Sequence, residues 1–337
     1  MAWLFWIAII LTVIYDILNG YNDGGSIIGT FVSTHFLSPV RIVMLVCFFE
    51  LCGIVIIYYI GMRIVHSITS LSLFAVTPAI ILAALGAAVI WKILTIAIGI
   101  PTSSAHALVG GLVGAIIVAY GWHGIAYDIF GKIIIVLLAT PVVSAVFSYT
   151  LMHLELFCLR WASPQVNRSL SKLQLLTIAI TSTLHGATEP QKTMAVLVLI
   201  LAAFGYQRDL SIPLWVVAVS VILIVIGILA GGWRIAKTFN RRLLKIRPLD
   251  AVTTQLTASI VILASALWGG TFSTSQVISS GLVGAGVAKR FNKVSWRVAR
   301  HILIAWLVTI PVTGLLAMLF WKFLRLSSIV VKGGLWV

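Results

Sequence analysis

The chain is a series of near-continuous apolar runs of about 20 residues, separated by short polar segments. An α-helix of that length spans the hydrocarbon core of a bilayer. The short alternating segments of a membrane β-barrel do not occur. The pattern predicts an all-α, multi-pass protein of the cell membrane with about 10–12 membrane segments. The segments assigned are 3–34 (broken), 42–60, 79–99, 101–116, 129–150, 173–206 (broken), 213–230, 252–268, 271–288 and 301–320.

Composition excludes a soluble protein. Hydrophobic residues make up 61% of the chain and charged residues only 9%, whereas about a quarter of a soluble domain is charged. A single core cannot bury that much apolar surface, so the lipid bilayer must solvate much of it. The net charge of +15 would suggest nucleic acid in a soluble protein. Here the basic residues lie in loops, which is typical of membrane orientation, so no nucleic-acid partner is expected.

Two pairs of similar segments recur along the chain. SSAHALVGGLVGA at 103–115 matches STSQVISSGLVGA at 273–285, which lies 170 residues later. NGYND at 19–23 corresponds to HGATE at 185–189, which lies 166 residues later. Because both pairs occur in the same order at similar spacing, the sequence predicts a two-fold repeat. The predicted parts are residues 1–155, a cytoplasmic linker at 156–172, and residues 173–337.

The basic residues predict that the two repeats have opposite orientations. The loops 231–250 and 289–300 carry six and five basic residues, whereas the corresponding first-half loops, 61–80 and 119–130, contain only Arg63. The two basic loops are therefore expected on the cytoplasmic side and their partners outside. This is an inverted-topology repeat, a common plan among secondary transporters. The N-terminus and the C-terminal tail are both expected outside, although the tail is basic.

The first polar motif runs from Asp16 to Ser26 and interrupts an apolar segment with two carboxylates and two amides. A carboxylate at the centre of a bilayer costs at least roughly 2.5–3.5 kcal/mol, so such residues usually face a cavity or bind an ion. The glycines within the motif are expected to let the helix unwind and expose backbone groups. The alternative interpretation is a polar turn outside the membrane.

The second motif runs from His185 to Thr193. Pro190 is expected to break the helix there, where Glu189 and Lys192 are three residues apart. The Glu–Lys pair either compensates buried charge or forms part of the ion-binding machinery.

Two hydroxyl-rich segments, 101–106 and 271–276, precede apolar helices that are short and rich in Ser and Gly. These helices, at 101–116 and 271–288, are candidates for re-entrant rather than spanning segments. A helix N-terminus offers unpaired N–H groups and favours an anion. Ordinary N-capping is the alternative for either segment alone. Two such segments, related by an inverted repeat, are expected to form a cage for a tetrahedral oxyanion.

At these residues the chain resembles the inorganic phosphate transporter (PiT) family. The family's repeated Gly-x-Asn-Asp signature resembles 19–23 and 185–189, and its Pro-x-Ser-Thr-Thr-His segment resembles 101–106 and 271–276. The stretch 297–311 is similar to the family's last helix, and the resemblance covers nearly the whole chain. Departures occur at Ser26, Ala105, Gln276 and the pair Thr188–Glu189. They leave the coupling ion open and, to a lesser degree, the choice between phosphate and sulfate.

The resemblance implies symport of inorganic phosphate with a coupling cation, Na⁺ or H⁺, by a homodimer without other cofactors. Asp23 and Glu189, with Asn19, are expected to bind the cation. The residues expected to bind the anion are Asn22, Asp23, Ser103, Ser104, Thr188, Gln191, Lys192, Ser273, Thr274 and Ser275.

Other functions remain as alternatives. A sulfate or other oxyanion permease of the same fold is the second hypothesis, and an anion channel is the third. A membrane enzyme is not expected: His106 beside Ser103 and Ser104 is the single candidate for a nucleophile–base pair, and the repeat has Gln276 in place of that histidine. Neither a Walker A nor a His-Glu-x-x-His motif occurs.

Overall fold

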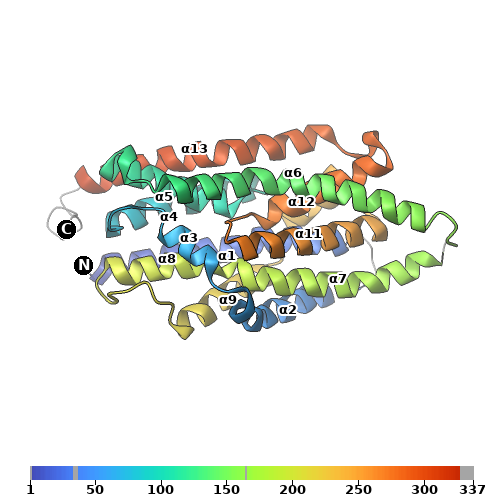
Figure 1. Ribbon diagram of the computed structural model, residues 1–337, viewed down its shortest axis with the longest axis horizontal. Coiled ribbons are helices and arrows are strands. Elements are labelled where there is room, and N and C mark those ends of the chain that lie inside the picture. The colour runs from blue at the N-terminus through green and yellow to red at the C-terminus, as the bar shows by residue number, and fades with distance from the viewer. Residues whose placement is uncertain (1, 33–36, 164, 327–337) are drawn as a thin grey trace.

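The computed structural model describes residues 2–32, 37–163 and 165–326. Within them the chain is almost entirely helical, and the helices lie side by side in one elongated bundle (Figure 1). The first-half helices are α1 (Ala2–Val32), α2 (Pro39–Ile60), α3 (Arg63–Thr69), α4 (Pro78–Ile98), α5 (Ser104–Tyr120), the 3₁₀ turn η1 (Trp122–Gly124) and α6 (Tyr127–Cys158). The second-half helices are α7 (Val166–Thr188), α8 (Pro190–Ala203), α9 (Leu214–Leu229), α10 (Trp233–Lys237), the π-helix η2 (Thr238–Leu243), α11 (Pro248–Trp268), α12 (Thr274–Lys289), the 3₁₀ turn η3 (Phe291–Lys293) and α13 (Trp296–Leu326).

All ten predicted segments are helical in the structure. Among the described residues, six helices are long and apolar enough to cross a bilayer: α1, α2, α4, α6, α11 and α13. At 17 and 16 residues, α5 and α12 reach only about 24–26 Å at 1.5 Å per residue. They are shorter than the roughly 30 Å hydrocarbon core, as expected for the two candidate re-entrant helices. The chain is a multi-pass membrane protein of the predicted all-α class.

The two halves have the same order of elements. Each runs from a long first segment through α2–α6 or α9–α13, with a 3₁₀ turn before the last helix. The last helices, α6 and α13, run in opposite directions (Figure 1). The α6–α7 connection and the turn before α13 lie at one end of the bundle, while α1 begins and α13 ends at the other. Opposite directions of the two last helices fit an inverted-topology repeat, and both the inverted repeat and the side of the membrane that each end faces stay predictions.

The break predicted within segment 3–34 is wrong, whereas the break predicted within segment 173–206 is confirmed. α1 is a continuous helix through the whole polar motif, from Ala2 to Val32. Its glycines serve close packing instead of unwinding: a Cβ at Gly20 would lie 2.1 Å from the carbonyl oxygen of Ile224 on α9. In the second half the helix does end, at Thr188, and α8 begins at Pro190. Proline has no N–H for the preceding turn, so the break follows from the sequence.

The predicted linker at 156–172 is largely helical. α6 continues to Cys158 and α7 already begins at Val166. Both helices extend beyond the apolar segments assigned to them, α6 with mostly apolar residues to Cys158 and α7 with mostly polar residues from Val166. Residues 327–337 of the C-terminal tail, Lys332 among them, lie outside the described residues.

Close helix–helix contacts at glycines, called glycine seams below, join the two halves of the chain. Gly20 on α1 packs against α9, and Gly186 on α7, 166 residues later, packs against the backbone of Glu50 on α2, where a Cβ would lie 2.2 Å from its carbonyl oxygen. Gly114 on α5 and Gly284 on α12 approach α13 and α6 equally closely. The two sequence repeats are therefore interleaved in space.

The α12–α6 seam gives a stability prediction. A Cβ at Gly284 would lie 2.1 Å from the carbonyl oxygen of Ala145, so Gly284→Ala is expected to destabilise the protein by about 1–3 kcal/mol through overpacking. Gly131 on α6 is a matched control, because a Cβ there meets nothing within 4 Å. Thermal unfolding of the purified variants should show a lower midpoint than the parent for Gly284→Ala and no decrease for Gly131→Ala. Equal midpoints would contradict the close approach of α12 and α6.

Candidate functional site

The short helices α5 and α12 both begin at the centre of the buried polar region. Ser103 and Ser273 are their N-cap residues, and the Ser103 side chain accepts a hydrogen bond from the backbone N–H of His106 at 3.1 Å. The Ser273 hydroxyl has no hydrogen-bond partner among the described residues. The first helical residues, Ser104 and Thr274, are 170 apart, as the sequence repeat predicts. Two positive helix ends therefore meet the same group of carboxylates.

Glu189 lies in the break between α7 and α8 and accepts hydrogen bonds from four side chains. Asn19 Nδ2 lies 3.3 Å and Ser104 Oγ 3.1 Å from Oε1, and Thr274 Oγ1 lies 3.3 Å from Oε2. Lys192 donates to Oε1 as a fully buried ion pair. The break thus delivers one carboxylate to the N-termini of both short helices.

Asp23 on α1 lies on the other side of the same cluster. Ser275 donates to its Oδ1, and Ser104 Oγ lies 3.5 Å from its Oδ2, so that Ser104 bridges Asp23 and Glu189. Asn22 Nδ2 lies 2.8 Å from Ser275 Oγ and 2.9 Å from the carbonyl oxygen of Thr102. Asn22 therefore connects α1 to the segments that precede α5 and α12.

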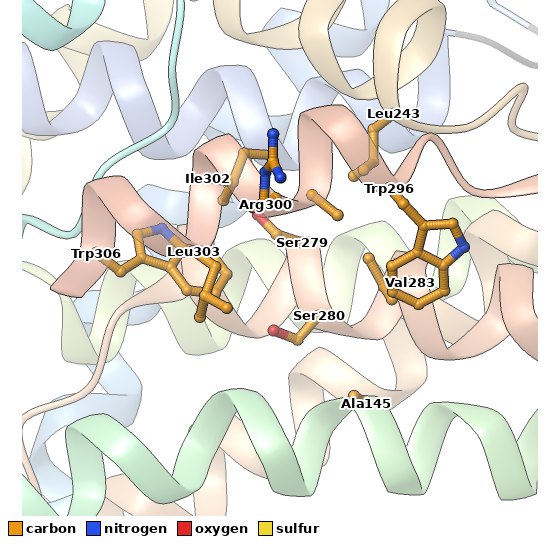
Figure 2. A pocket seen from close by; sticks show the side chains of 11 residues that line it. Ala145, Leu243, Ser279, Ser280, Val283, Trp296, Arg300, Ile302, Leu303 and Trp306 are labelled. Carbon is orange, nitrogen blue, oxygen red and sulfur yellow. The ribbon is translucent and has the colours of Figure 1, made fainter.

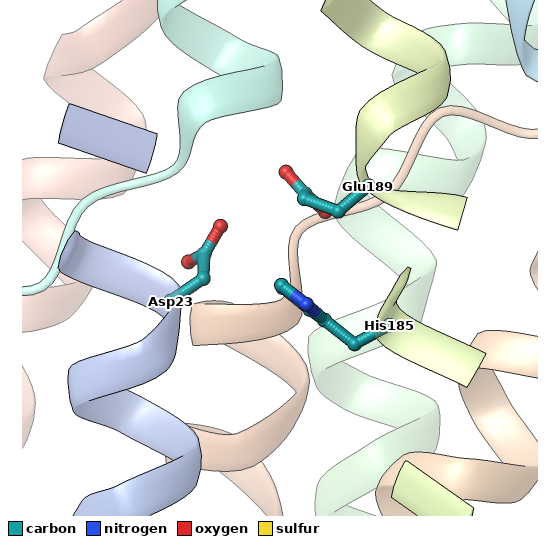
Figure 3. Close-up of side chains that lie close together, drawn as sticks. All are labelled: Asp23, His185 and Glu189. Atoms are coloured by element: carbon teal, nitrogen blue, oxygen red, sulfur yellow. The ribbon is translucent and has the colours of Figure 1, made fainter. Parts of the chain in front are cut away.

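A third group approaches the two carboxylates from α7. Asp23, His185 and Glu189 each offer one ligand atom, and these atoms lie within 4.8 Å of one another. Figure 3 shows the three side chains directed toward a common point, Asp23 from α1, His185 from α7 and Glu189 from the break that follows α7. His185 Nδ1 lies 2.7 Å from Glu50 Oε1 on α2, while its Nε2 has no hydrogen-bond partner among the described residues. Oxygen and imidazole donors at this spacing can hold a cation.

Two charged residues of the site were missed by the sequence analysis. Glu50 on α2 orients His185, and Lys92 on α4 is fully buried, with an Nζ that has no hydrogen-bond partner among the described residues. Lys92 is close enough to Asp23 and Glu189 to interact electrostatically with both. The available signal was a single charged residue within an otherwise apolar membrane segment, which is by default a functional candidate.

The structure brings most predicted site residues together but directs some elsewhere. The cluster contains Asn19, Asn22, Asp23, Ser104, Glu189, Lys192, Thr274 and Ser275. Thr188 instead bonds the Leu184 carbonyl of its own helix at 2.7 Å. Gln191 bonds the carbonyl of Gly61 at 3.2 Å and accepts from the N–H of Ile64 at 3.2 Å, so it holds the turn between α2 and α3.

The cluster is closed to solvent, and the surface pockets lie away from it. The side chains of Asp23, Glu189, Lys192 and Ser275 are fully buried. An apolar pocket of about 260 Å³ lies between α6, α12 and α13, with Arg300 and Trp306 in its wall (Figure 2). Its lining suits hydrocarbon better than an anion. A ligand can therefore reach the cluster only through a conformational change, as in alternating access.

Comparison with known proteins identifies relatives over nearly the whole chain. The sequence matches the phosphate transporter family at residues 19–162 and 158–317. A probable low-affinity inorganic phosphate transporter of Bacillus subtilis is 31% identical over 310 residues, covering 91% of this chain and 93% of the relative. A protein of the same description from Rhizobium meliloti is 31% identical over 315 residues, covering 92% and 93%. A putative phosphate permease of Pyrococcus furiosus is 20% identical over 385 residues, covering 91% and 93%.

A solved structure has the same fold. It is described as "The sodium-dependent phosphate transporter", and it superposes with a TM-score of 0.84 at 20% sequence identity, covering 97% of this chain and all of that chain. The likeness confirms the predicted polytopic fold.

Proposed function

Because the chain belongs to the phosphate transporter family, a transporter family and not a family of enzymes, we propose that it imports inorganic phosphate by symport with a cation, Na⁺ or H⁺. The observation that carries this proposal is the meeting of two helix N-termini at the buried Asp23–Glu189 pair. Helix N-termini and hydroxyls bind an anion, whereas carboxylates bind a cation. A site with both sets of groups suits the joint transport of the two.

The charges of the buried region support cation coupling. Among the described residues, four carboxylates are fully buried: Asp16, Asp23, Glu50 and Glu189. By the same measure, the fully buried Lys and His side chains of the described residues are Lys92, Lys192 and His185. An entering phosphate would add negative charge to a region in which acids outnumber bases, and buried net charge is costly. A cation entering with the anion offsets that cost.

Unpartnered donors mark where the anion would bind. Lys92 Nζ and Ser273 Oγ are buried without a hydrogen-bond partner among the described residues, and an unpaired buried polar group costs about 1–3 kcal/mol. Lys92 interacts electrostatically with both carboxylates, and Ser273 precedes Thr274, which bonds Glu189. We assign these two residues, with the hydroxyls of Ser104 and Ser275, to the phosphate site. Asp23, Glu189 and Asn19 are assigned to the part of the site that holds positive charge.

Uptake into proteoliposomes tests the proposal. Purified protein should accumulate radiolabelled phosphate when an inward Na⁺ or proton gradient is imposed, and not when the gradient is collapsed. Uptake that follows the phosphate gradient alone, at channel-like rates, would favour the anion channel. Cross-linking and light scattering of the same sample would test the homodimer that the family resemblance implies.

Sulfate is expected to compete poorly with phosphate. Phosphate keeps at least one hydroxyl proton at neutral pH and can donate a hydrogen bond, whereas sulfate can only accept. The amide oxygen of Asn22 lies buried beside Asp23 and has no hydrogen-bond partner among the described residues, so sulfate would leave an acceptor unpaired at a cost of about 1–3 kcal/mol, or roughly 5- to 150-fold in affinity. Competition of labelled phosphate uptake measures this ratio. Equal inhibition by sulfate and unlabelled phosphate would favour the oxyanion permease.

A further inference from the structure

The ammonium group of Lys192 is held in one place by its surroundings. The side chain is fully buried, and its Nζ donates to Glu189 Oε1 from one turn further along the chain. The ring of Phe272, just before α12, lies 5.9 Å from Nζ. A desolvated ammonium near an aromatic face gains a cation–π attraction. Lys192 therefore places a positive charge directly against Glu189.

Glu189 has little capacity left for a free cation. Its Oε1 accepts from Lys192, Asn19 and Ser104, and its Oε2 accepts from Thr274. A metal ion binds through the lone pairs of such oxygens, and here three donors already surround Oε1 and one donor bonds Oε2. The carboxylate is satisfied by groups of the chain itself.

The first repeat differs at the corresponding position. Asp23 and Glu189 are 166 residues apart, and the same offset relates Ser26 to Lys192. Ser26 Oγ lies 3.3 Å from Ser275 Oγ, which donates to Asp23. Among the described residues, no Lys, Arg or His side chain forms an ion pair with Asp23. One repeat thus pairs its carboxylate with an ammonium, and the other supplies a hydroxyl.

We propose that Lys192 is a tethered substitute for one of two coupling cations. This inference rests on the proposed function, because the repeat gives two equivalent carboxylates and hence two equivalent cation positions. The ammonium fills the position at Glu189 permanently, and a free cation binds only on the Asp23 side. A tethered ammonium stays with the protein during transport, so each phosphate is accompanied by one fewer imported cation than in a transporter with two open positions.

The test restores the missing position. Lys192→Ser gives the second repeat the residue that the first has at Ser26, so the variant should bind one more Na⁺ or Li⁺ than the parent protein. Without phosphate, added Na⁺ should raise its melting temperature more than that of the parent, with choline as the inert cation. Lys192→Arg keeps the charge, so added Na⁺ should raise its melting temperature no more than it does for the parent. The double variant Glu189→Gln/Lys192→Ser lacks the carboxylate and should not gain the extra stabilisation.

The Na⁺ dependence of phosphate binding gives a second measurement, and it already tests the inference on the unmodified protein. Below saturation, a tenfold rise in Na⁺ should strengthen binding by at most about tenfold in the parent and by about tenfold more in Lys192→Ser. A parent that binds phosphate with a two-cation dependence would overturn the inference, as would a Lys192→Ser variant with the same dependence as the parent. A parent that binds no phosphate would instead overturn the proposed function, while the melting experiment would still decide the role of Lys192.

Discussion

Replacement of Asp23 by asparagine is expected to abolish phosphate uptake while the folded protein remains in the membrane. Asp23 is fully buried and, among the described residues, has no ion-pair partner. Asparagine has nearly the same shape but cannot neutralise a bound cation. Losing one partner of a buried charge pair costs about 3–5 kcal/mol, so cation-driven uptake should fall at least about a hundredfold. Initial rates in proteoliposomes measure the effect.

The control for this substitution is Asp209→Asn. Asp209 is exposed in the loop between α8 and α9, where its carboxylate accepts hydrogen bonds from the side chains of Gln207 and Ser211. The chemical change is the same, and uptake should remain that of the parent. Normal uptake by a well-folded Asp23→Asn variant would remove Asp23 from the cation site.

Removal of single hydroxyls from the cluster is expected to weaken phosphate binding about tenfold or more. Ser104→Ala, Thr274→Ala and Ser275→Ala each delete a donor to Glu189 or Asp23. A hydrogen bond to a charged group is worth roughly 1.5–3 kcal/mol, and 1.4 kcal/mol is a factor of about ten. The carboxylates that lose a donor also become less well positioned. Apparent affinity for phosphate, measured from concentration-dependent uptake, should fall at one or more of these positions.

Buried serines outside the cluster provide the comparison. Ser144 and Ser148 on α6 donate to the carbonyl oxygens of Val277 and Gly281 at 2.6 and 2.7 Å. Their alanine variants lose a buried hydrogen bond too, but one that joins α6 to α12. They should lower thermal stability without changing the affinity of the remaining folded protein. If the cluster variants behave in the same way, their hydroxyls only cap helices.

The sequence was sufficient to predict the long helices and the main polar motifs, but not the short helices α3 and α10. Apolar runs of membrane-spanning length leave helices as the remaining solution, and Pro190 required a break where α7 ends. The offset of 170 placed the starts of α5 and α12 in equivalent positions, at Ser104 and Thr274. These features depend on neighbouring residues along the chain, so they can be predicted directly from the sequence.

Features that depend on distant partners could not be predicted. A glycine lacks a side chain, but only the position of Ile224 on α9 shows that Gly20 permits close packing and not unwinding. Gln191 lies within the second motif, yet its amide bonds the turn between α2 and α3. Glu50 and Lys92 belong to the site because α2 and α4 pack near the broken helix. No local pattern around either residue reveals which carboxylate or histidine it faces.

The interleaving of the two halves has a consequence for biosynthesis. The seams of Gly20 and Gly114 are completed by α9 and α13, and the seam of Gly186 joins α7 back to α2. When the first half leaves the ribosome, these backbone surfaces have no partner, and contacts between segments distant in sequence form slowly. The first-half helices therefore remain incompletely packed in the bilayer until the second half has been inserted. Native packing, and with it the enclosure of Asp23, is achieved only after α13 has been synthesised.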